Sequence, residues 1–376
     1  MKSLGLYIHI PFCVKKCHYC DFYSISHTSA KEREYINALC SHMRSEAHIY
    51  KDYEIDTVFF GGGTPSVLSC ESFSAIANTI KECFNLSKSL EFTVEANPGT
   101  VDREKLLTYK RAGVNRLSIG LQSANEQELH TLGRIHSLSV FEQGYALARE
   151  CGFDNISVDV MYGLPNQKIE DFAKTLDHVC DLKPEHISAY CLKVEENTPF
   201  GKMKDTLSLP GEDEEYEMYM LLCDKLKSFG YEQYEISNFA QKGFHSMHNM
   251  KYWLSQEYIS YGPASHSYFG GVRYSYCRSI DKYMEKPTKE YEVENCEGSV
   301  AKIDEMDEYV MLKLRLSQGI DEQEFYERFS ATFIQEYPQI EEFVKSGYIE
   351  HKNGAYCMNS RGFFVSNYIL TEILHF

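Results

Sequence analysis

The 376-residue sequence has no long apolar run. Nowhere does it approach the ~18 consecutive apolar residues that a membrane-spanning helix needs. Its first residues also lack the basic segment, apolar run and cleavage site of a secretory signal. These absences predict a cytoplasmic protein with no membrane anchor of its own. Thiols stay reduced in that compartment, so the 13 cysteines do not indicate a disulfide framework.

Basic residues are also in short supply. The chain has 38 Lys and Arg against 55 Asp and Glu, which gives a formal net charge of −17. A surface that negative repels phosphate backbones, so we do not expect nucleic acid as a partner. The composition is otherwise that of an ordinary globular protein, and the length allows two or three domains or a barrel with an appendage.

Three of the cysteines gather in one polar loop with the spacing Cys13-x3-Cys17-x2-Cys20. Three thiolates on a four-iron cluster leave one iron open, and a chelating ligand can occupy it. A structural zinc site is an alternative, because His9 or His18 could supply the fourth ligand that zinc requires. Simple burial of three thiols is the remaining interpretation, and the polar surroundings disfavour it.

The first half of the chain alternates between apolar, β-branched stretches and amphipathic stretches of helical period. The expected strands are 4–10, 55–60, 90–95, 116–121, 156–161 and 186–192, and the expected helices between them are 32–49, 70–84, 103–112, 138–150 and 169–182. This alternation predicts an α/β fold in which crossover helices connect parallel strands. After residue 192 the alternation stops. The later segments read as a helix over 212–229, a strand over 231–236 and a hairpin over 348–356 that turns at Asn353-Gly354.

Polar residues follow several of the predicted strands directly. They include the cysteine loop, the glycine turn 61–65, Glu95, Gln122 and Asp159. Ligand sites in α/β folds lie at the carboxyl ends of the strands, so we expect these residues to gather at one rim. The three glycines free the backbone for close approach to a small ligand. Each acidic residue taken alone is more typical of a structural role.

A second candidate site lies in the segment HNMKYW, which begins at His248 and contains the only tryptophan. A histidine beside aromatic residues suggests a haem ligand with stacking neighbours. A single histidine in an aromatic loop is more often just packed or exposed, so the residues of this segment alone favour that alternative.

Together these motifs resemble the HemN/HemW group, which comprises the oxygen-independent coproporphyrinogen III dehydrogenases and their relatives. The matching segments, in order, are YIHIPFCVKKCHYCDF, FFGGGTPS, EANP, NRLSIGLQS, LGRIH, DVMYGLPNQ, YEISNFA and HNMKYW. The resemblance implies a partial (β/α)6 radical-SAM barrel with a smaller, mainly helical C-terminal domain. We expect the barrel over residues 1–236, a connecting region with HNxxYW over 237–301 and the C-terminal domain over 302–376.

The resemblance also implies cofactors. Cys13, Cys17 and Cys20 match the ligands of a [4Fe–4S] cluster, and S-adenosylmethionine (SAM) would bind at its open iron. The positions that match the family's SAM contacts are Tyr7, Gly62, Gly63, Thr64, Glu95, Gln122, Arg134 and Asp159. In the family, the glycine turn and the Glu95 position hold the methionyl part, and the Asp159 position meets the ribose. A flavodoxin- or ferredoxin-type protein is the expected electron donor.

Three features indicate the HemW branch of the group, whose members are haem chaperones. Phe22 stands where the dehydrogenases carry a further cysteine, only 12 residues precede Cys13, and HNxxYW is typical of this branch. The branch implies haem binding, partly through His248, and delivery to haem-accepting proteins such as respiratory enzymes. The alternative is the dehydrogenase itself, an enzyme that converts two propionate side chains to vinyl groups by radical oxidative decarboxylation.

Overall fold

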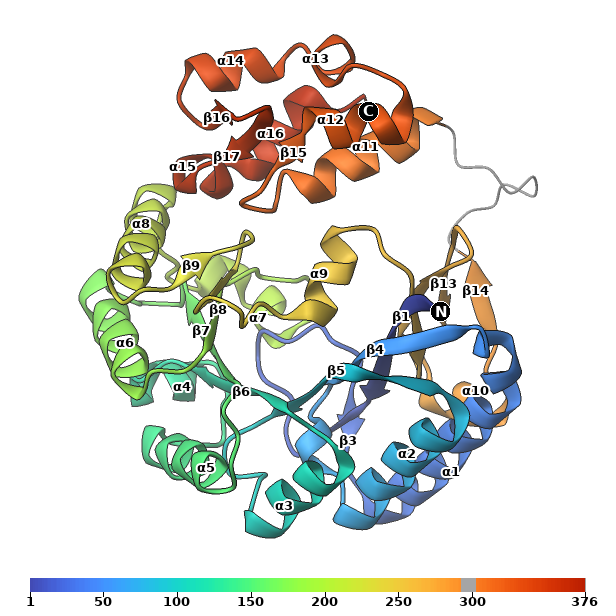
Figure 1. The fold of residues 1–376 in the computed structure, drawn as a ribbon. Helices are drawn as coiled ribbons and strands as arrows, with labels where there is room; N and C mark the ends of the chain where they lie inside the picture. Colours follow the sequence, from blue (N-terminus) through green and yellow to red (C-terminus); the bar gives the residue numbers. More distant parts are fainter. Residues whose placement is uncertain (292–301, 376) are drawn as a thin grey trace. The chain divides into compact units, whose positions relative to one another are not determined.

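The computed structural model describes residues 1–291 and 302–375, and the chain forms two compact units (Figure 1). Of the described residues, 1–210 and 257–291 belong to the first unit, and 211–256 and 302–375 belong to the second. This division follows the contacts within the chain. The three ranges expected from the sequence divide the chain by function, and they stay a prediction.

Six parallel strands form the body of the first unit. In sheet order they are β1 (Lys2–Ile10), β4 (Tyr53–Gly62), β5 (Asn85–Ala96), β6 (Arg116–Gln122), β7 (Ile156–Tyr162) and β8 (His186–Cys191). Their order in the sheet is their order in the chain, as crossover connections require. This confirms the predicted α/β fold of parallel strands, and all six strands were expected from the sequence.

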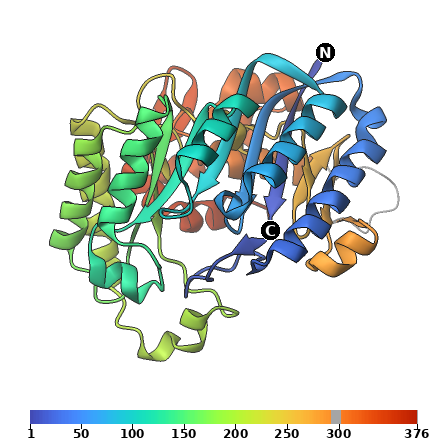
Figure 2. The same ribbon diagram turned by 90° about the horizontal axis from the view of Figure 1, so that it is seen from below.

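Helices cover the outer face of this sheet (Figures 1 and 2). They are α1 (Ser29–Glu46), α2 (Cys70–Cys83), α3 (Arg103–Ala112), α4 (Glu126–Thr131), α5 (Leu138–Glu150) and α6 (Ile169–Leu182), with short helices η1 (Ala47–Tyr50), η2 (Pro65–Val67), α7 (Pro199–Lys202) and η3 (Lys204–Thr206) in the connections. Side-chain caps at Thr28, Ser69, Asp102 and Ser137 fix where four of the main helices begin.

The strand register gathers polar side chains inside the barrel. Glu95 pairs in register with Ser118, which pairs with Ser157 on β7. One layer further along, Asp159 pairs with Ser188 on β8. Residues paired in register on parallel strands point to the same side of the sheet, so these side chains line one interior wall. The opposite faces of the strands pack under the helices and carry the apolar core.

The sheet continues beyond β1 with strands that the sequence analysis did not predict. They are β11 (Tyr258–Tyr261), parallel to β1, and then the antiparallel strands β12 (His266–Phe269), β13 (Val272–Tyr276) and β14 (Lys289–Tyr291), with α10 (Ile280–Glu285) between the last two. We call residues 257–291 the extension. Its described strands are at most five residues long, so they show no clear period.

The second unit is mainly helical, as expected. Its helices are α8 (Glu212–Ser228), α9 (Met247–Trp253), α11 (Lys302–Lys313), α12 (Glu322–Phe329), α13 (Phe333–Glu336), α14 (Ile340–Lys345), α15 (Ser360–Phe364) and α16 (Ser366–Ile373). Its strands are the antiparallel pair β9 (Glu232–Gln233) and β10 (Asn238–Ala240) and the sheet of β15 (Ile320–Asp321), β17 (Ala355–Met358) and β16 (Ile349–Lys352).

The predicted hairpin is confirmed, because Asn353 and Gly354 both have positive φ, 53° and 78°, between β16 and β17. Across residues 1–291 and 302–375, no helix is both long and apolar enough to cross a bilayer.

Candidate cluster and cofactor site

The cysteine loop lies between two short parallel strands, β2 (Phe12–Cys13) and β3 (Ile25–Ser26). Cys13 is buried, whereas Cys17 and Cys20 are half-buried, and all three are free thiols. The amide of Cys20 donates to the carbonyl of Cys17 at 3.3 Å, which turns the chain between these two cysteines. Burial raises the pKa of the Cys20 thiol to about 11.

The glycine turn at the end of β4 packs directly against this loop. The amide of Gly63 donates to the carbonyl of Ile10 at 2.9 Å. A β-carbon at Gly63 would lie 2.7 Å from the carbonyl oxygen of Phe12, so only glycine fits. Gly62 has φ of 110°, and a β-carbon there would overlap the His9 ring at 2.5 Å. The turn therefore holds the backbone next to the first cysteine.

Polar groups contact two of the three thiols. Thr64 Oγ1 lies 3.5 Å from Cys13 Sγ, and Arg134 Nη1 donates to Cys17 Sγ at 3.6 Å. Asn97 joins these partners, because it donates to Thr64 at 2.8 Å and accepts from Arg134 at 2.9 Å. The sequence analysis did not single out Asn97, although it belongs to the segment EANP that was noted for Glu95.

A pocket opens beside Cys17. It has an empty volume of about 330 Å³ and is lined by Val14, Lys15, Cys17, Thr64, Asn97, Pro98, Thr100, Gly133, Arg134, Ile135 and His136. Arg134 is its main charged group and also donates to the carbonyl of Gly120 at 2.7 Å. Its Nε is buried, and within the described part of the chain it has no hydrogen-bond partner. The pocket therefore has a cationic wall next to a thiol.

Glu95 and Asp159 lie deeper inside the barrel. Burial raises the pKa of Glu95 to about 8, and the nearby Asp159 carboxyl adds to the rise. Burial also raises the pKa of Asp159, although its oxygen accepts a hydrogen bond from Ser118 at 3.0 Å. Two carboxyl groups so close in a buried wall favour a cationic or hydroxyl-bearing ligand.

Gln122 lies at a break in the strand register. The pairing of β6 with β7 shifts between Gly120 and Gln122, and Gln122 has φ of 73°. A bulge of this kind redirects a side chain at the end of a strand. A positive φ is costly for a residue other than glycine, so the local conformation is held by its surroundings.

Tyr7 belongs to a short hydrogen-bonded chain at the end of β1. Burial lowers the pKa of His9 to about 4, so its imidazole is neutral at physiological pH. His9 Nε2 lies 3.0 Å from the carbonyl oxygen of Tyr23 and must donate to it. Its Nδ1, 3.2 Å from the Tyr7 hydroxyl, therefore accepts from that hydroxyl.

Tyr19 is a further residue of this region that sequence reasoning missed. It follows His18 in the cysteine loop and interacts electrostatically with Arg134, Cys17, Cys20 and Asp159. Burial raises the pKa of its hydroxyl. Its ring also packs on the apolar cluster of Leu132, Met161, Leu164, Leu192 and Phe200. A tyrosine between two cysteines gives no signal in the sequence that it points inward.

His248 lies in α9 of the second unit. Its side chain is only 1% exposed, and its Nε2 lies 2.8 Å from the hydroxyl of Tyr252. The two rings meet edge to face with centroids 5.2 Å apart. This nitrogen can bind iron only if the imidazole leaves Tyr252.

The thiol-lined region fits an iron–sulfur cluster better than a single metal ion. Within residues 1–291 and 302–375, no three His, Cys, Asp or Glu side chains come close enough to hold one ion together. Three free thiols, a glycine turn and an unused donor on Arg134 suit a larger group with a bound ligand.

Comparisons with known proteins agree with this geometry. The pattern of the Radical SAM superfamily matches residues 7–179, and that of the HemN C-terminal domain matches residues 300–365. The chain is 35% identical to the "Heme chaperone HemW" of Bacillus subtilis over 378 residues, which covers 100% of this chain and 99% of the relative. It is 33% identical to the Escherichia coli protein of the same name, over 93% of this chain and 92% of that one.

A solved structure resembles the whole fold. The E. coli protein described as "Coproporphyrinogen III oxidase (HemN)", a radical SAM enzyme, superposes with a TM-score of 0.85 at 20% identity, covering 98% of this chain and 89% of that chain. At this identity the likeness shows the fold alone. The two relatives above, at 35% and 33% identity over nearly their whole lengths, show the family. The chain belongs to the HemW family of the radical SAM superfamily.

Proposed function

We propose that this protein is a haem chaperone, which binds haem and transfers it to haem-accepting proteins such as respiratory enzymes. The observation that carries the proposal is the 35% identity with a relative named as a heme chaperone, over 100% of this chain. Phe22 in place of a further cysteine supports the same branch, because the dehydrogenases carry a cysteine at this position.

The first unit holds the cofactors in this proposal. Cys13, Cys17 and Cys20 hold a [4Fe–4S] cluster, whose open iron would bind SAM and, with one electron, supply radical chemistry. The free thiols, and the glycine turn that positions the backbone beside them, support this assignment. An acidic one-electron carrier of the flavodoxin or ferredoxin type would reduce the cluster, and the cytosol would keep the thiols reduced.

The residues around the thiols would bind SAM in this proposal. Glu95, as a carboxylate, would take the ammonium group, with Gly62, Gly63 and Thr64 placing the backbone beside the methionyl part. Arg134 would meet the carboxylate of SAM, which an arginine can bind through two donors. Asp159 would accept from the ribose hydroxyls. Tyr7 and Gln122 would complete the site from the ends of β1 and β6.

His248 would contribute to the haem site. Release from Tyr252 exposes the imidazole nitrogen, so haem binding is coupled to a change in α9. Haem titration of the wild type and of the His248→Ala variant, followed by absorbance, tests this assignment. We expect the variant to bind haem at least about tenfold more weakly, because the bond between the imidazole and the iron is lost.

His245→Ala is the matched control for that experiment. His245 lies three residues before His248, just ahead of α9, and stacks on Tyr234 with ring centroids 4.2 Å apart. An unchanged spectrum and affinity in His248→Ala would remove His248 as a haem ligand. A wild-type chain that binds no haem would overturn the chaperone proposal.

A further inference from the structure

We propose that residues 277–283 of the extension are positioning residues. They hold residues 21–23 of the cysteine loop, here called the arm, which directly follow Cys20. By holding the arm they fix the Cys20 thiol at the cluster site. These residues lie outside both matched family patterns, which cover residues 7–179 and 300–365. The proposal rests on the cluster assignment made under the proposed function.

Two direct contacts join this segment to the arm. Arg278 Nη2 donates to the carbonyl oxygen of Asp21 at 2.5 Å and lies 3.4 Å from the Asp21 carboxylate. The amide of Ile280 donates to the hydroxyl of Tyr23 at 2.8 Å. Asp21 directly follows Cys20, so the first contact holds the peptide bond between Asp21 and Phe22. The arm is therefore fastened at its main chain and at a side chain.

The same arm is fastened to the barrel from its other side. The carbonyl of Tyr23 accepts the hydrogen bond from His9 Nε2 at 3.0 Å. Tyr23 thus connects α10 with β1, the strand that leads into the cysteine loop. Phe22 between the two contacts has an exposed side chain, and its carbonyl oxygen accepts from Lys16 Nζ at 2.9 Å within the cysteine loop.

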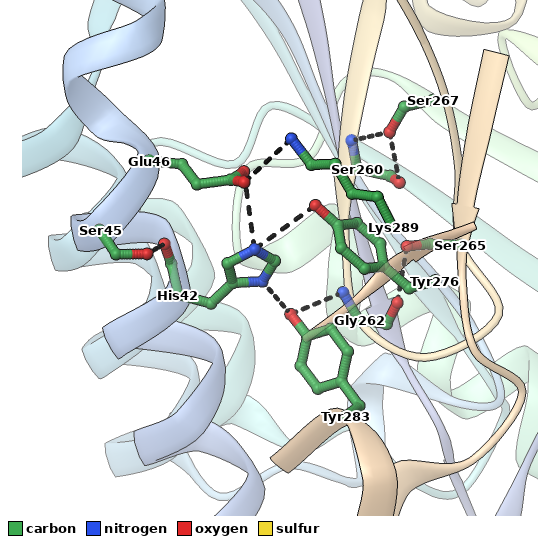
Figure 3. Close-up of polar contacts among 10 residues, drawn as sticks. All are labelled: His42, Ser45, Glu46, Ser260, Gly262, Ser265, Ser267, Tyr276, Tyr283 and Lys289. Carbon is green, nitrogen blue, oxygen red and sulfur yellow. Dashed lines mark hydrogen bonds and ion pairs between the residues drawn. The ribbon is translucent and has the colours of Figure 1, made fainter. Parts of the chain in front are cut away.

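The positioning segment is itself held by a buried network (Figure 3). The Tyr283 hydroxyl accepts from the amide of Gly262 at 3.0 Å and lies 2.8 Å from His42 Nδ1 on α1. Gly262 has φ of 117°, and a β-carbon there would lie 2.6 Å from the hydroxyl of Tyr35 and 2.9 Å from the carbonyl of His9. Tyr283 therefore ties α10 to the turn that packs on the end of β1.

Charged groups complete this network. His42 Nε2 lies 3.5 Å from a Glu46 oxygen and 3.4 Å from the Tyr276 hydroxyl. Lys289 on β14 forms an ion pair with the other Glu46 oxygen at 2.9 Å, as Figure 3 shows. Tyr283 at the end of the segment and Tyr276 just before it thus both contact His42 on α1, which supports the segment from that helix.

The contacts of Arg278 and Tyr23 should affect the position of the arm more than the overall stability of the chain. The Arg278 side chain is 57% exposed, and an exposed pair of this kind contributes little to overall stability. Its removal leaves the barrel core untouched but allows the arm after Cys20 to open. The expected consequence is a labile cluster ligand in a normally folded chain.

The test uses the full chain, reconstituted anaerobically with iron and sulfide, in the variants Arg278→Ala and Tyr23→Phe. The readouts are the rate of iron release to a ferrous chelator and the thermal midpoint of unfolding. We expect iron release roughly fivefold faster in each variant, the effect of losing one hydrogen bond, with an unchanged midpoint. Lys282→Ala is the control, because Lys282 is exposed on the same helix.

A second measurement uses the metal-free chain, in which alkylation of Cys20 is followed by mass spectrometry with Cys70 as the internal reference. Both variants should react faster at Cys20 and at the wild-type rate at Cys70. Rates equal to those of Lys282→Ala would overturn the proposal. A wild type that takes up no iron would overturn the cluster assignment instead, and the alkylation rates would then decide whether the arm is held.

Discussion

At the scale of single residues, the carboxyl group of Glu95 inside the barrel should make the stability of the chain depend on pH. Burial raises its pKa from 4.5 to about 8, so the folded chain keeps this proton while the unfolded chain loses it near pH 4.5. Stability therefore falls as the pH rises from about 4.5 to 8. Glu95→Gln removes this pH dependence and should raise the free energy of unfolding by on the order of 2 kcal/mol at the upper end of this pH range.

Urea unfolding at both ends of this pH window measures the effect. Glu104→Gln on the exposed face of α3 is the control, and it should leave the pH profile of the wild type in place. Equal profiles for wild type and Glu95→Gln would contradict the burial argument. If Glu95 also binds the ammonium of SAM, the stabilised variant should bind SAM more weakly, and affinity in the wild type should rise toward pH 8.

The glycine turn gives a second prediction at this scale. Gly63→Ala places a methyl group 2.7 Å from a carbonyl oxygen of the cysteine loop, and backbone atoms cannot yield without moving that loop. We expect a loss of about 2–3 kcal/mol in unfolding free energy and poorer iron uptake after reconstitution. Gly144→Ala in α5 meets nothing nearer than 3.8 Å and should raise stability by up to about 1 kcal/mol. The same sign in both variants would refute the steric explanation.

The sequence identified residues whose type and spacing are unusual, and it missed residues whose role depends on where the folded chain points their side chains. The spacing of Cys13, Cys17 and Cys20 and the run of three glycines are unusual enough to be recognised alone. Asn97 and Tyr19 are ordinary residues until the strand register and the loop point them at Arg134. Only the folded chain shows that His248 is buried against Tyr252.

At the scale of elements, the junction of α1 and α2 shows how a helix start supports the barrel. Ser69 caps α2 by accepting from the amide of Ser72 at 3.1 Å and donates to Glu32 on α1 at 2.8 Å. Ser69→Ala removes both bonds and leaves a buried carboxylate with fewer donors. We expect a loss of about 1–2 kcal/mol by urea unfolding.

Ser74→Ala is the matched control within α2. Its hydroxyl donates to the carbonyl of Cys70, four residues earlier in the same helix. That carbonyl is also in position to accept the helical backbone hydrogen bond, so loss of the hydroxyl should change the free energy of unfolding by less than about 0.5 kcal/mol. A similar loss in both variants would show that the link to Glu32 contributes nothing beyond helix propensity.

The elements that the sequence predicted are those with long, regular patterns. All six barrel strands and the helices α1, α2, α3, α5 and α6 were expected because their hydrophobic periods extend over six or more residues, whereas the short helix α4 was not predicted. The extension escaped prediction because its strands are short and their order depends on pairing with β1, a partner more than 200 residues away in sequence. Periodicity within a segment carries no information about such a partner.

At the scale of the whole molecule, the family and the fold answer different questions. The likeness to the coproporphyrinogen III oxidase structure extends over 98% of the chain but shows only the fold, because identity is 20%. The relatives named as heme chaperones are similar in sequence throughout. The same barrel can support either function, so activity must be measured rather than inferred from architecture.

The most direct measurement compares two activities of one anaerobically reconstituted preparation. The first is the rate of haem transfer to an apo form of a respiratory haem protein, relative to spontaneous haem release to a scavenger. The second is the formation of protoporphyrinogen IX from coproporphyrinogen III with SAM and a reductant. The account predicts transfer faster than spontaneous release and no porphyrinogen product. Turnover to protoporphyrinogen IX, with haem transfer no faster than release, would contradict it.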